Sequence, residues 1–129
     1  SNPTSISQVA AEAALNGDQG CITPMLDAFK ARHRYVVDAL NAIPGFNCVD
    51  SGGAFYAFPD VRAAIMNLLA RDVIEAPTDI AFSEYLLESA DVAVVPGSAF
   101  GAEGYIRLSF ATSQANLEKA LKRIAQAMA

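Results

Sequence analysis

The sequence predicts an α+β fold, in which a small, mostly antiparallel sheet of about four short strands is covered on one face by helices. Two observations lead to this prediction. Apolar residues recur every three or four positions over long segments, which is the period of an amphipathic helix. Between those segments lie short apolar runs bounded by glycine and proline, which is typical of short strands.

Two helices are expected at the start of the chain. The first spans 4–16, where Thr4 or Ser5 can cap it and Gly17 ends it. The second is long, spans 20–43 and ends at Pro44-Gly45. Its apolar stripe includes His33, which the pattern indicates is a packed core or interface residue rather than a catalytic base.

The remaining chain is expected to alternate between strands and helices. Short apolar runs predict strands over residues 46–49, 54–58, 91–95 and 105–110. Helices are expected over 61–75, after a cap at Thr78, and after a cap at Ser113.

The last expected strand carries the most informative residue. Along 105–110 the apolar Ile106, Leu108 and Phe110 alternate with polar residues, so they point toward the helices. Arg107 is then held by a rigid strand on the uncovered face. A guanidinium in that position suits two-pronged binding of a carboxylate or phosphate. The alternative is an ordinary solvent-facing arginine.

Two glycine-containing segments are further candidates for ligand contact. Val95–Gly101 follows a strand, and Gly52-Gly53 precedes the aromatic pair Phe55-Tyr56. Glycines let a ligand approach the backbone closely, although plain turns and core packing explain both segments equally well. We expect Gly52-Gly53 and Pro96-Gly97 to lie close together, at one end of the sheet beside Arg107.

Composition and charge limit the class of protein. The chain has 129 residues, of which 53% are hydrophobic and 18% charged, so it is long and apolar enough for one domain with a core. The net charge of -5 disfavours nucleic-acid binding. No apolar run reaches the roughly 20 residues that span a bilayer. Two cysteines without CxxC spacing and one histidine disfavour a metal site, and the cytoplasm is the expected location.

The residue types needed for catalysis are not found in a recognisable pattern. The sequence shows no Ser/His/Asp spacing and no phosphate-binding loop. Its three lysines, Lys30, Lys119 and Lys122, fall on amphipathic helices, and none follows a strand or lies in a pocket of small residues that would desolvate it.

Taken together, the motifs resemble the C-terminal portion of fold-type-I aminotransferases that use pyridoxal 5'-phosphate, in particular bacterial aspartate and aromatic aminotransferases. The resemblance covers essentially the whole chain. It rests mainly on Gly52-Gly53-Ala54-Phe55-Tyr56, Val94-Val95-Pro96-Gly97-Ser98-Ala99-Phe100-Gly101 and Ile106-Arg107-Leu108-Ser109-Phe110-Ala111.

The resemblance implies a role for three residues. Arg107 looks like the arginine that binds the α-carboxylate of the amino-acid substrate, and Phe55 and Gly53 would line the substrate entrance. In the family the Schiff-base lysine and most residues that bind pyridoxal 5'-phosphate precede this region. The resemblance therefore implies no catalytic residue in this chain, and a cofactor held by a large domain that the chain lacks.

The family also implies a division of the chain and a set of partners. Residues 1–18 would be a large-domain remnant, 19–43 a bridging helix and 44–129 the small domain that clamps the substrate. The partners would be amino acids, 2-oxo acids, the missing large domain and a second copy in a homodimer. Because the chain starts at Ser1-Asn2-Pro3 without a methionine, we expect it to be a piece of a longer protein, inactive alone.

Two other readings remain open at this level. A lyase, decarboxylase or synthase of the same fold could share the Arg107 strand. A free-standing α/β module that binds a small molecule without catalysis would be a protein of another class.

Overall fold

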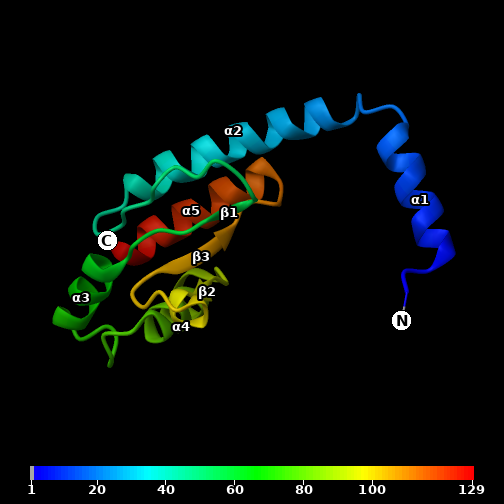
Figure 1. Cartoon of the computed structure of the whole chain (residues 1–129). Coiled ribbons are helices and arrows are strands. Elements are labelled where there is room, and N and C mark those ends of the chain that lie inside the picture. The colour runs from blue at the N-terminus through cyan, green and yellow to red at the C-terminus, as the bar shows by residue number, and fades with distance from the viewer. Residues whose placement is uncertain (1) are drawn as a thin grey trace.

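The computed structural model describes residues 2–129, which form five α-helices, one 3-10 helix and a three-stranded sheet (Figure 1). In chain order these are α1 Ser5–Asn16, α2 Ile22–Asn41, β1 Tyr56–Ala57, α3 Arg62–Ala70, α4 Asp79–Ala90, β2 Val95–Pro96, η1 Gly97–Phe100, β3 Ile106–Ser109 and α5 Gln114–Met128. The predicted fold class is confirmed, with fewer and shorter strands than expected.

The sheet has β3 at its centre, in the order β1-β3-β2, and both pairings are antiparallel. Tyr56 lies opposite Ser109, and Val95 lies opposite Arg107. Ile106 and Leu108 are buried, Ser109 is exposed and Arg107 is half-buried, as the alternation predicts.

The relative position of the two glycine segments differs from the expectation. Strands β1 and β2 are both antiparallel to β3, so they run parallel to each other. The start of β1 and the end of β2 therefore lie at opposite ends of the sheet. The Phe110 N–H donates to the Phe55 carbonyl at one end (2.9 Å), and the Gly97 N–H donates to the Tyr105 carbonyl at the other (2.7 Å). The prediction that Gly52-Gly53 and Pro96-Gly97 share one end is wrong.

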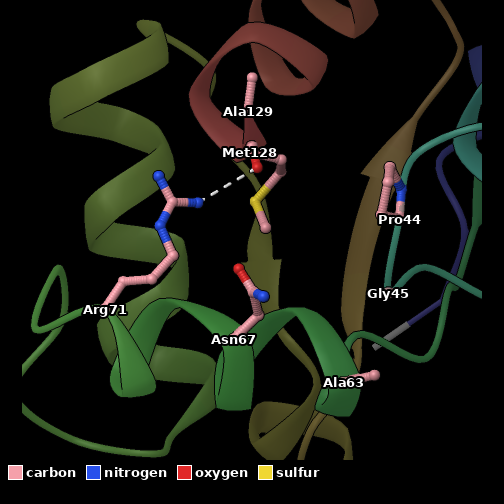
Figure 2. Close-up of a pocket in the computed structure, with 7 residues that line it drawn as sticks. All are labelled: Pro44, Gly45, Ala63, Asn67, Arg71, Met128 and Ala129. Atoms are coloured by element: carbon pink, nitrogen blue, oxygen red, sulfur yellow. Dashed lines mark hydrogen bonds between the residues drawn. The ribbon is translucent and has the colours of Figure 1, made fainter.

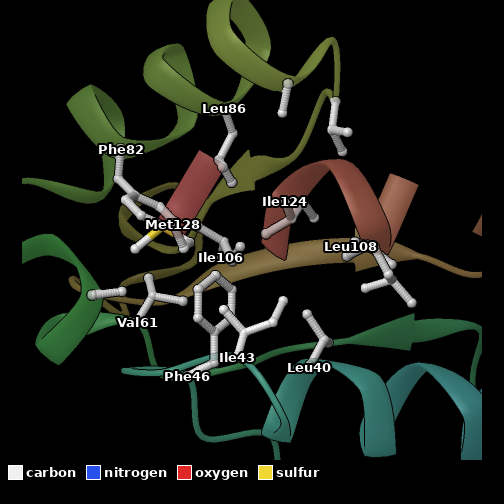
Figure 3. Close-up of a cluster of buried hydrophobic side chains, with 14 of the residues drawn as sticks. Leu40, Ile43, Phe46, Val61, Phe82, Leu86, Ile106, Leu108, Ile124 and Met128 are labelled. Atoms are coloured by element: carbon white, nitrogen blue, oxygen red, sulfur yellow. The ribbon is translucent and has the colours of Figure 1, made fainter. Parts of the chain in front are cut away.

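The core lies between the buried face of the sheet and helices α2, α3, α4 and α5. Figure 3 shows side chains of α2, α4, β3 and α5 meeting in one cluster. Its members include Leu40, Ile43, Phe46, Val61, Phe82, Leu86, Ile106, Leu108, Ile124 and Met128. Burial of these side chains holds β3, and with it Arg107, in a fixed position.

The expected strand over 46–49 is reduced to a single bridge between Asn47 and Asp60. The side chain of Asn41 takes the place of a neighbouring strand. Its amide donates to the Cys48 carbonyl (3.0 Å), and its oxygen accepts from the Cys48 N–H (2.7 Å). The backbone groups of Cys48 are thus satisfied without a sheet partner.

Other element boundaries also shift. Helix α2 spans Ile22–Asn41 instead of 20–43, and β3 spans Ile106–Ser109 instead of 105–110. Helix α3 ends at Ala70 instead of continuing to 75, because Asp72 adopts a left-handed φ of 55° that turns the chain. Residues 91–94 are not a strand, since Asp91 is left-handed (φ 50°) and the Val92 N–H donates back to Leu86 at the end of α4 (3.2 Å).

Helix α1 projects away from the rest of the chain in Figure 1, and none of its residues is buried. Its cap is Thr4, whose hydroxyl accepts from the Ser7 N–H (3.3 Å), as predicted. Along residues 2–129 we find no helix whose length and apolar character would let it cross a bilayer.

Candidate functional site

Arg107 is the centre of the candidate site, and β3 positions it. Its neighbours in sequence, Ile106 and Leu108, are buried in the core. The side chain of Arg107 consequently leaves on the opposite face of the sheet, where it is half-buried.

Two aromatic rings flank the guanidinium of Arg107, one from β1 and one from η1. Its Cζ lies 4.3 Å from the centre of the Tyr56 ring, which β1 carries. It lies 4.5 Å from the centre of the Phe100 ring, in η1 directly after β2. Because β1 and β2 lie on either side of β3, the rings approach from two sides. Such contacts are attractive to a cation and restrict the rotation of its side chain.

The guanidinium has no anionic partner among residues 2–129. The acidic side chains in contact with basic ones in this part of the chain are paired as Arg62–Asp60, Arg123–Asp91 and His33–Asp50, and none of these contacts includes Arg107. A half-buried cation whose N–H groups are free is suited to bind a carboxylate with two parallel hydrogen bonds.

The loop that carries Phe100 is anchored by Asp79, the first residue of α4. Its carboxylate accepts a hydrogen bond from the Ser98 N–H (2.6 Å). Burial raises the pKa of the Asp79 carboxyl, but hydrogen bonds from the backbone and hydroxyl of Ser98 and from the backbone of Asp79 and Gly104 outweigh this effect. The pKa of Asp79 therefore lies below its ordinary value of 3.8, and the group is ionised at neutral pH.

Phe55 and Gly53, the other two predicted site residues, lie toward the far end of β3. Phe55 is exposed, and its ring centre is 4.4 Å from that of Tyr56, which in turn contacts Arg107. Gly53 is exposed and has open space around its Cα. It lines a small hollow of about 130 Å³ with His33 and Phe110. The structure links Phe55 to Arg107 through Tyr56, and it leaves Gly53 in a separate hollow.

His33 takes part in an arrangement that the sequence does not reveal. Its Nδ1 lies 3.4 Å from the Asp50 carboxylate, and its Nε2 lies 3.2 Å from the Ser51 hydroxyl. The expectation that the chain has no Ser/His/Asp arrangement is thus wrong, because His33 contacts both Asp50 and Ser51. The Asp50 side chain is 86% exposed, however, so it can rotate freely and orients the imidazole poorly. The His33 ring packs on Phe110 at 5.2 Å, which agrees with the predicted packing role.

A larger hollow lies elsewhere on the molecule, between α3 and the end of α5 (Figure 2). It has a volume of about 560 Å³ and is lined by Pro44, Gly45, Ala63, Asn67, Arg71, Met128 and Ala129. Arg71 donates to the Met128 carbonyl across it (3.4 Å). Its lining includes none of the predicted site residues.

No lysine of this chain lies where it could hold pyridoxal 5'-phosphate covalently. The lysines Lys30, Lys119 and Lys122 are all exposed, so none is desolvated in a way that would favour a covalent bond to the cofactor. Among residues 2–129 there is also no group of side chains able to hold a metal ion.

Sequence reasoning missed three residues of this site. Tyr56 and Phe100 lie within the sequence motifs, where core packing explains Tyr56 and a turn explains Phe100. Asp79 lies outside the motifs. The alternation of Tyr56 with the buried Ala57 could have placed Tyr56 on the same face as Arg107. No local pattern reveals the Asp79–Ser98 bond, because it joins positions 19 residues apart.

Comparisons with known proteins find relatives of this chain. Residues 1–124 match the family described as aminotransferase class I and II. An aspartate/prephenate aminotransferase of Nitrosomonas europaea is 61% identical over 125 residues, which are 97% of this chain and 32% of that relative. An aspartate aminotransferase of Rhizobium meliloti is 47% identical over 125 residues, 97% of this chain and 30% of that relative.

Solved structures show the same fold. The crystal structure of the aspartate aminotransferase from Rhizobium meliloti gives a TM-score of 0.86 at 44% identity, over 99% of this chain and 32% of that one. Alanine aminotransferase from Pyrococcus furiosus gives 0.84 at 31% identity, over 98% of this chain and 30% of that one. The chain thus spans about a third of the length of these relatives. On the match over residues 1–124, the chain belongs to the aminotransferase class I and II family.

Proposed function

We propose that this chain is the substrate-clamping part of a pyridoxal-phosphate-dependent aminotransferase, and that Arg107 binds the α-carboxylate of the substrate. The observation that carries the proposal is the guanidinium itself. It is half-buried, lies between the Tyr56 and Phe100 rings and has no acid partner among residues 2–129. Its free N–H groups match the two oxygens of a carboxylate.

The names of the relatives support a substrate that carries this group. They are called aspartate, aspartate/prephenate, alanine and aromatic aminotransferases. Their named substrates differ in the side chain, but an α-amino acid and the 2-oxo acid derived from it both carry a carboxylate next to the reacting carbon. We therefore assign Arg107 to binding the carboxylate that all these substrates share. Phe55 and Gly53 are assigned to the entrance of the substrate site.

The chemistry at Cα requires a cofactor that this chain does not hold. Pyridoxal 5'-phosphate, when bound, supplies an electron sink that stabilises negative charge at Cα. We assign its binding, and the catalytic lysine, to the portion of the full-length protein that the chain does not span, so the chain alone is inactive. Arg107 contributes by fixing the carboxylate, which limits the orientations of the Cα–H bond.

We propose the same division of the chain as the family implies: 1–18 with the large domain, 19–43 as a bridge and 44–129 as the small domain. The absence of buried residues in α1 supports the first part of this division. Mounting Arg107 on a separate small domain would couple substrate binding to closure and to exclusion of water. We also propose that the full-length protein is a homodimer located in the cytoplasm.

The test is the substitution Arg107→Lys in the full-length protein. Lysine keeps the charge but cannot form two parallel hydrogen bonds. We expect kcat/KM for an amino acid to fall by about two to four decades, equivalent to roughly 3–5 kcal/mol. The matching amine, which lacks the carboxylate, should be barely affected.

Arg62→Lys is the matched control. Arg62 also lies over an aromatic ring, that of Tyr105 at 5.7 Å, but Asp60 already occupies its guanidinium. This variant should keep the preference for the amino acid over the amine. Equal losses for both substrates in Arg107→Lys, or no loss at all, would show that Arg107 is structural.

A further inference from the structure

We propose that Asp79 is a positioning residue for the carboxylate site: it holds η1 so that the Phe100 ring stays against the guanidinium of Arg107. This inference deepens the proposed function and rests on it. Asp79 does not touch the substrate in this proposal, and it acts only through Ser98 and Phe100.

The burial of Asp79 is the first observation. Its residue surface is only 3% exposed, and it is the one charged residue in the buried set of residues 2–129. An ionised carboxylate in such a place needs hydrogen bonds to offset the loss of water. The short bond from the Ser98 N–H, at 2.6 Å, supplies one, and it joins the start of α4 to η1.

The position of Ser98 explains why η1 needs an outside acceptor. Ser98 follows Gly97, the first residue of the 3-10 helix, and the first N–H groups of a helix have no partner within it. The neighbouring Gly97 N–H is already taken by the Tyr105 carbonyl. Gly97 is also packed so closely that a Cβ would lie 2.3 Å from the Ala102 carbonyl oxygen. The Tyr105 contact fixes one side of η1, and the Asp79 bond fixes the other.

Phe100 transmits this restraint to Arg107. It lies two residues after Ser98, and it is 50% exposed, so burial alone does not fix its ring. Its edge-on contact with Phe58, at 6.1 Å, and its contact with Arg107, at 4.5 Å, both depend on where the η1 backbone lies. Releasing Ser98 would let the ring move and would loosen the guanidinium.

A purely structural role is the competing explanation, because a negative charge also stabilises the start of α4. Thr78→Ala separates the two roles. Thr78 caps the same helix end by accepting from the Ala81 N–H (3.1 Å), and its loss weakens α4 while leaving the Asp79–Ser98 bond in place.

The experiment uses the full-length protein with its cofactor and compares Asp79→Ala, which removes the acceptor for the Ser98 N–H, with Phe100→Leu, their combination, and Thr78→Ala. Two quantities are measured: the ratio of kcat/KM for an amino acid to that for the matching amine, and the dissociation constant of succinate. Succinate reports carboxylate binding without turnover, because it has no amino group.

We expect Asp79→Ala to raise KM for the amino acid and to weaken succinate binding by about tenfold, with kcat and the amine little changed. Phe100→Leu should do the same, and the double variant should be no worse than Phe100→Leu alone, because both act along one path. Thr78→Ala should lower the unfolding temperature without changing the ratio. If Asp79→Ala does not fold, Asp79→Ser takes its place, because its short side chain also removes the carboxylate while keeping a polar group in the first turn of the helix.

The outcomes separate this inference from the function it rests on. If Arg107→Lys fails to distinguish amino acid from amine, the proposed function falls and the inference with it. If Arg107→Lys distinguishes them while Asp79→Ala behaves like Thr78→Ala, only the inference is overturned. Independent, multiplying effects of Asp79→Ala and Phe100→Leu would overturn it as well.

Discussion

Two aromatic rings restrain the guanidinium of Arg107 and leave its N–H groups free to bind a ligand. Aromatic rings contact the faces of such a group, whereas a carboxylate binds the N–H groups in its plane. Tyr56 and Phe100 can therefore restrict Arg107 without competing with a ligand. An acidic neighbour would also have restrained the side chain, but it would have occupied those N–H groups.

Acid stability should reveal the ionised state of Asp79. Its pKa is lowered on folding, so its contribution is fully present above the ordinary value of 3.8 and is lost as the pH falls through the lower folded value. We expect the wild-type chain to be more stable than Asp79→Asn near pH 6. This difference should shrink as the pH falls below 3.8, because the unfolded chain then binds a proton that the folded carboxylate resists. Urea unfolding at several pH values measures it.

Asp38→Asn serves as the control for net charge in that series. Asp38 is exposed on α2, so its replacement removes one carboxylate without touching the core. A difference between Asp79→Asn and wild type that stays constant from pH 6 to pH 3 would contradict the ionised, hydrogen-bonded state of Asp79.

Among the elements, the strands depend most on partners outside themselves. Strands β1 and β2 have two residues each, so few backbone hydrogen bonds hold the sheet, and side chains supply others. Asn41 is the clearest case, because its amide pairs with both backbone groups of Cys48. It ties the end of α2 to the segment that leads into β1.

Asn41→Ala should therefore destabilise the chain by about 1–3 kcal/mol, because the partly buried polar groups of Cys48 lose their partners. Asn116→Ala is the matched control. The Asn116 side chain bonds only to the exposed Thr112 hydroxyl, and its loss should change stability by less than about 0.5 kcal/mol. Urea unfolding at pH 7 measures both, and equal effects would show that the Asn41 bonds contribute nothing specific.

Capped helix starts are predictable from the sequence, and strands are not. The sequence offers Thr4 or Ser5, Thr78 and Ser113 as caps, and Thr4, Thr78 and Ser113 each accept a hydrogen bond from the N–H three residues on. The start of α2 has no side-chain cap, and it lies at Ile22 instead of residue 20. A cap is a local interaction, so a few residues determine it. Strand pairing joins distant segments, which a local pattern does not reveal. Cys48 bonds to the Asn41 side chain instead of a strand, and Asp91 adopts a left-handed turn at the end of α4.

At the scale of the whole molecule, one end of the chain exposes apolar surface. Helix α1 and the first turns of α2 carry exposed Ile6, Val9, Met25 and Leu26, of which Ile6 is 82% exposed. Contiguous apolar surface of this kind drives association. We expect the isolated 129-residue chain to self-associate through α1 and α2 at about 100 µM, as measured by light scattering.

Paired substitutions locate the contact. Val9→Glu with Met25→Glu places charges on the exposed apolar surface and should shift the chain to a monomer. Met66→Glu is the control, because Met66 is a similarly exposed apolar residue on α3, away from α1. A wild-type monomer at millimolar concentration, or an equal effect of Met66→Glu, would contradict the prediction.

The sequence by itself determined the fold class, the main helices and the face on which Arg107 lies. These follow from periodicity and from capping, which are properties of neighbouring residues. Only the tertiary structure decided that Gly52-Gly53 and Pro96-Gly97 lie at opposite ends of the sheet, and that Tyr56, Phe100 and Asp79 assemble around Arg107. Those relations depend on strand order and direction. Strand order and direction are set by backbone pairing between segments that are far apart in the sequence. The packing of these segments in one core stabilises that pairing.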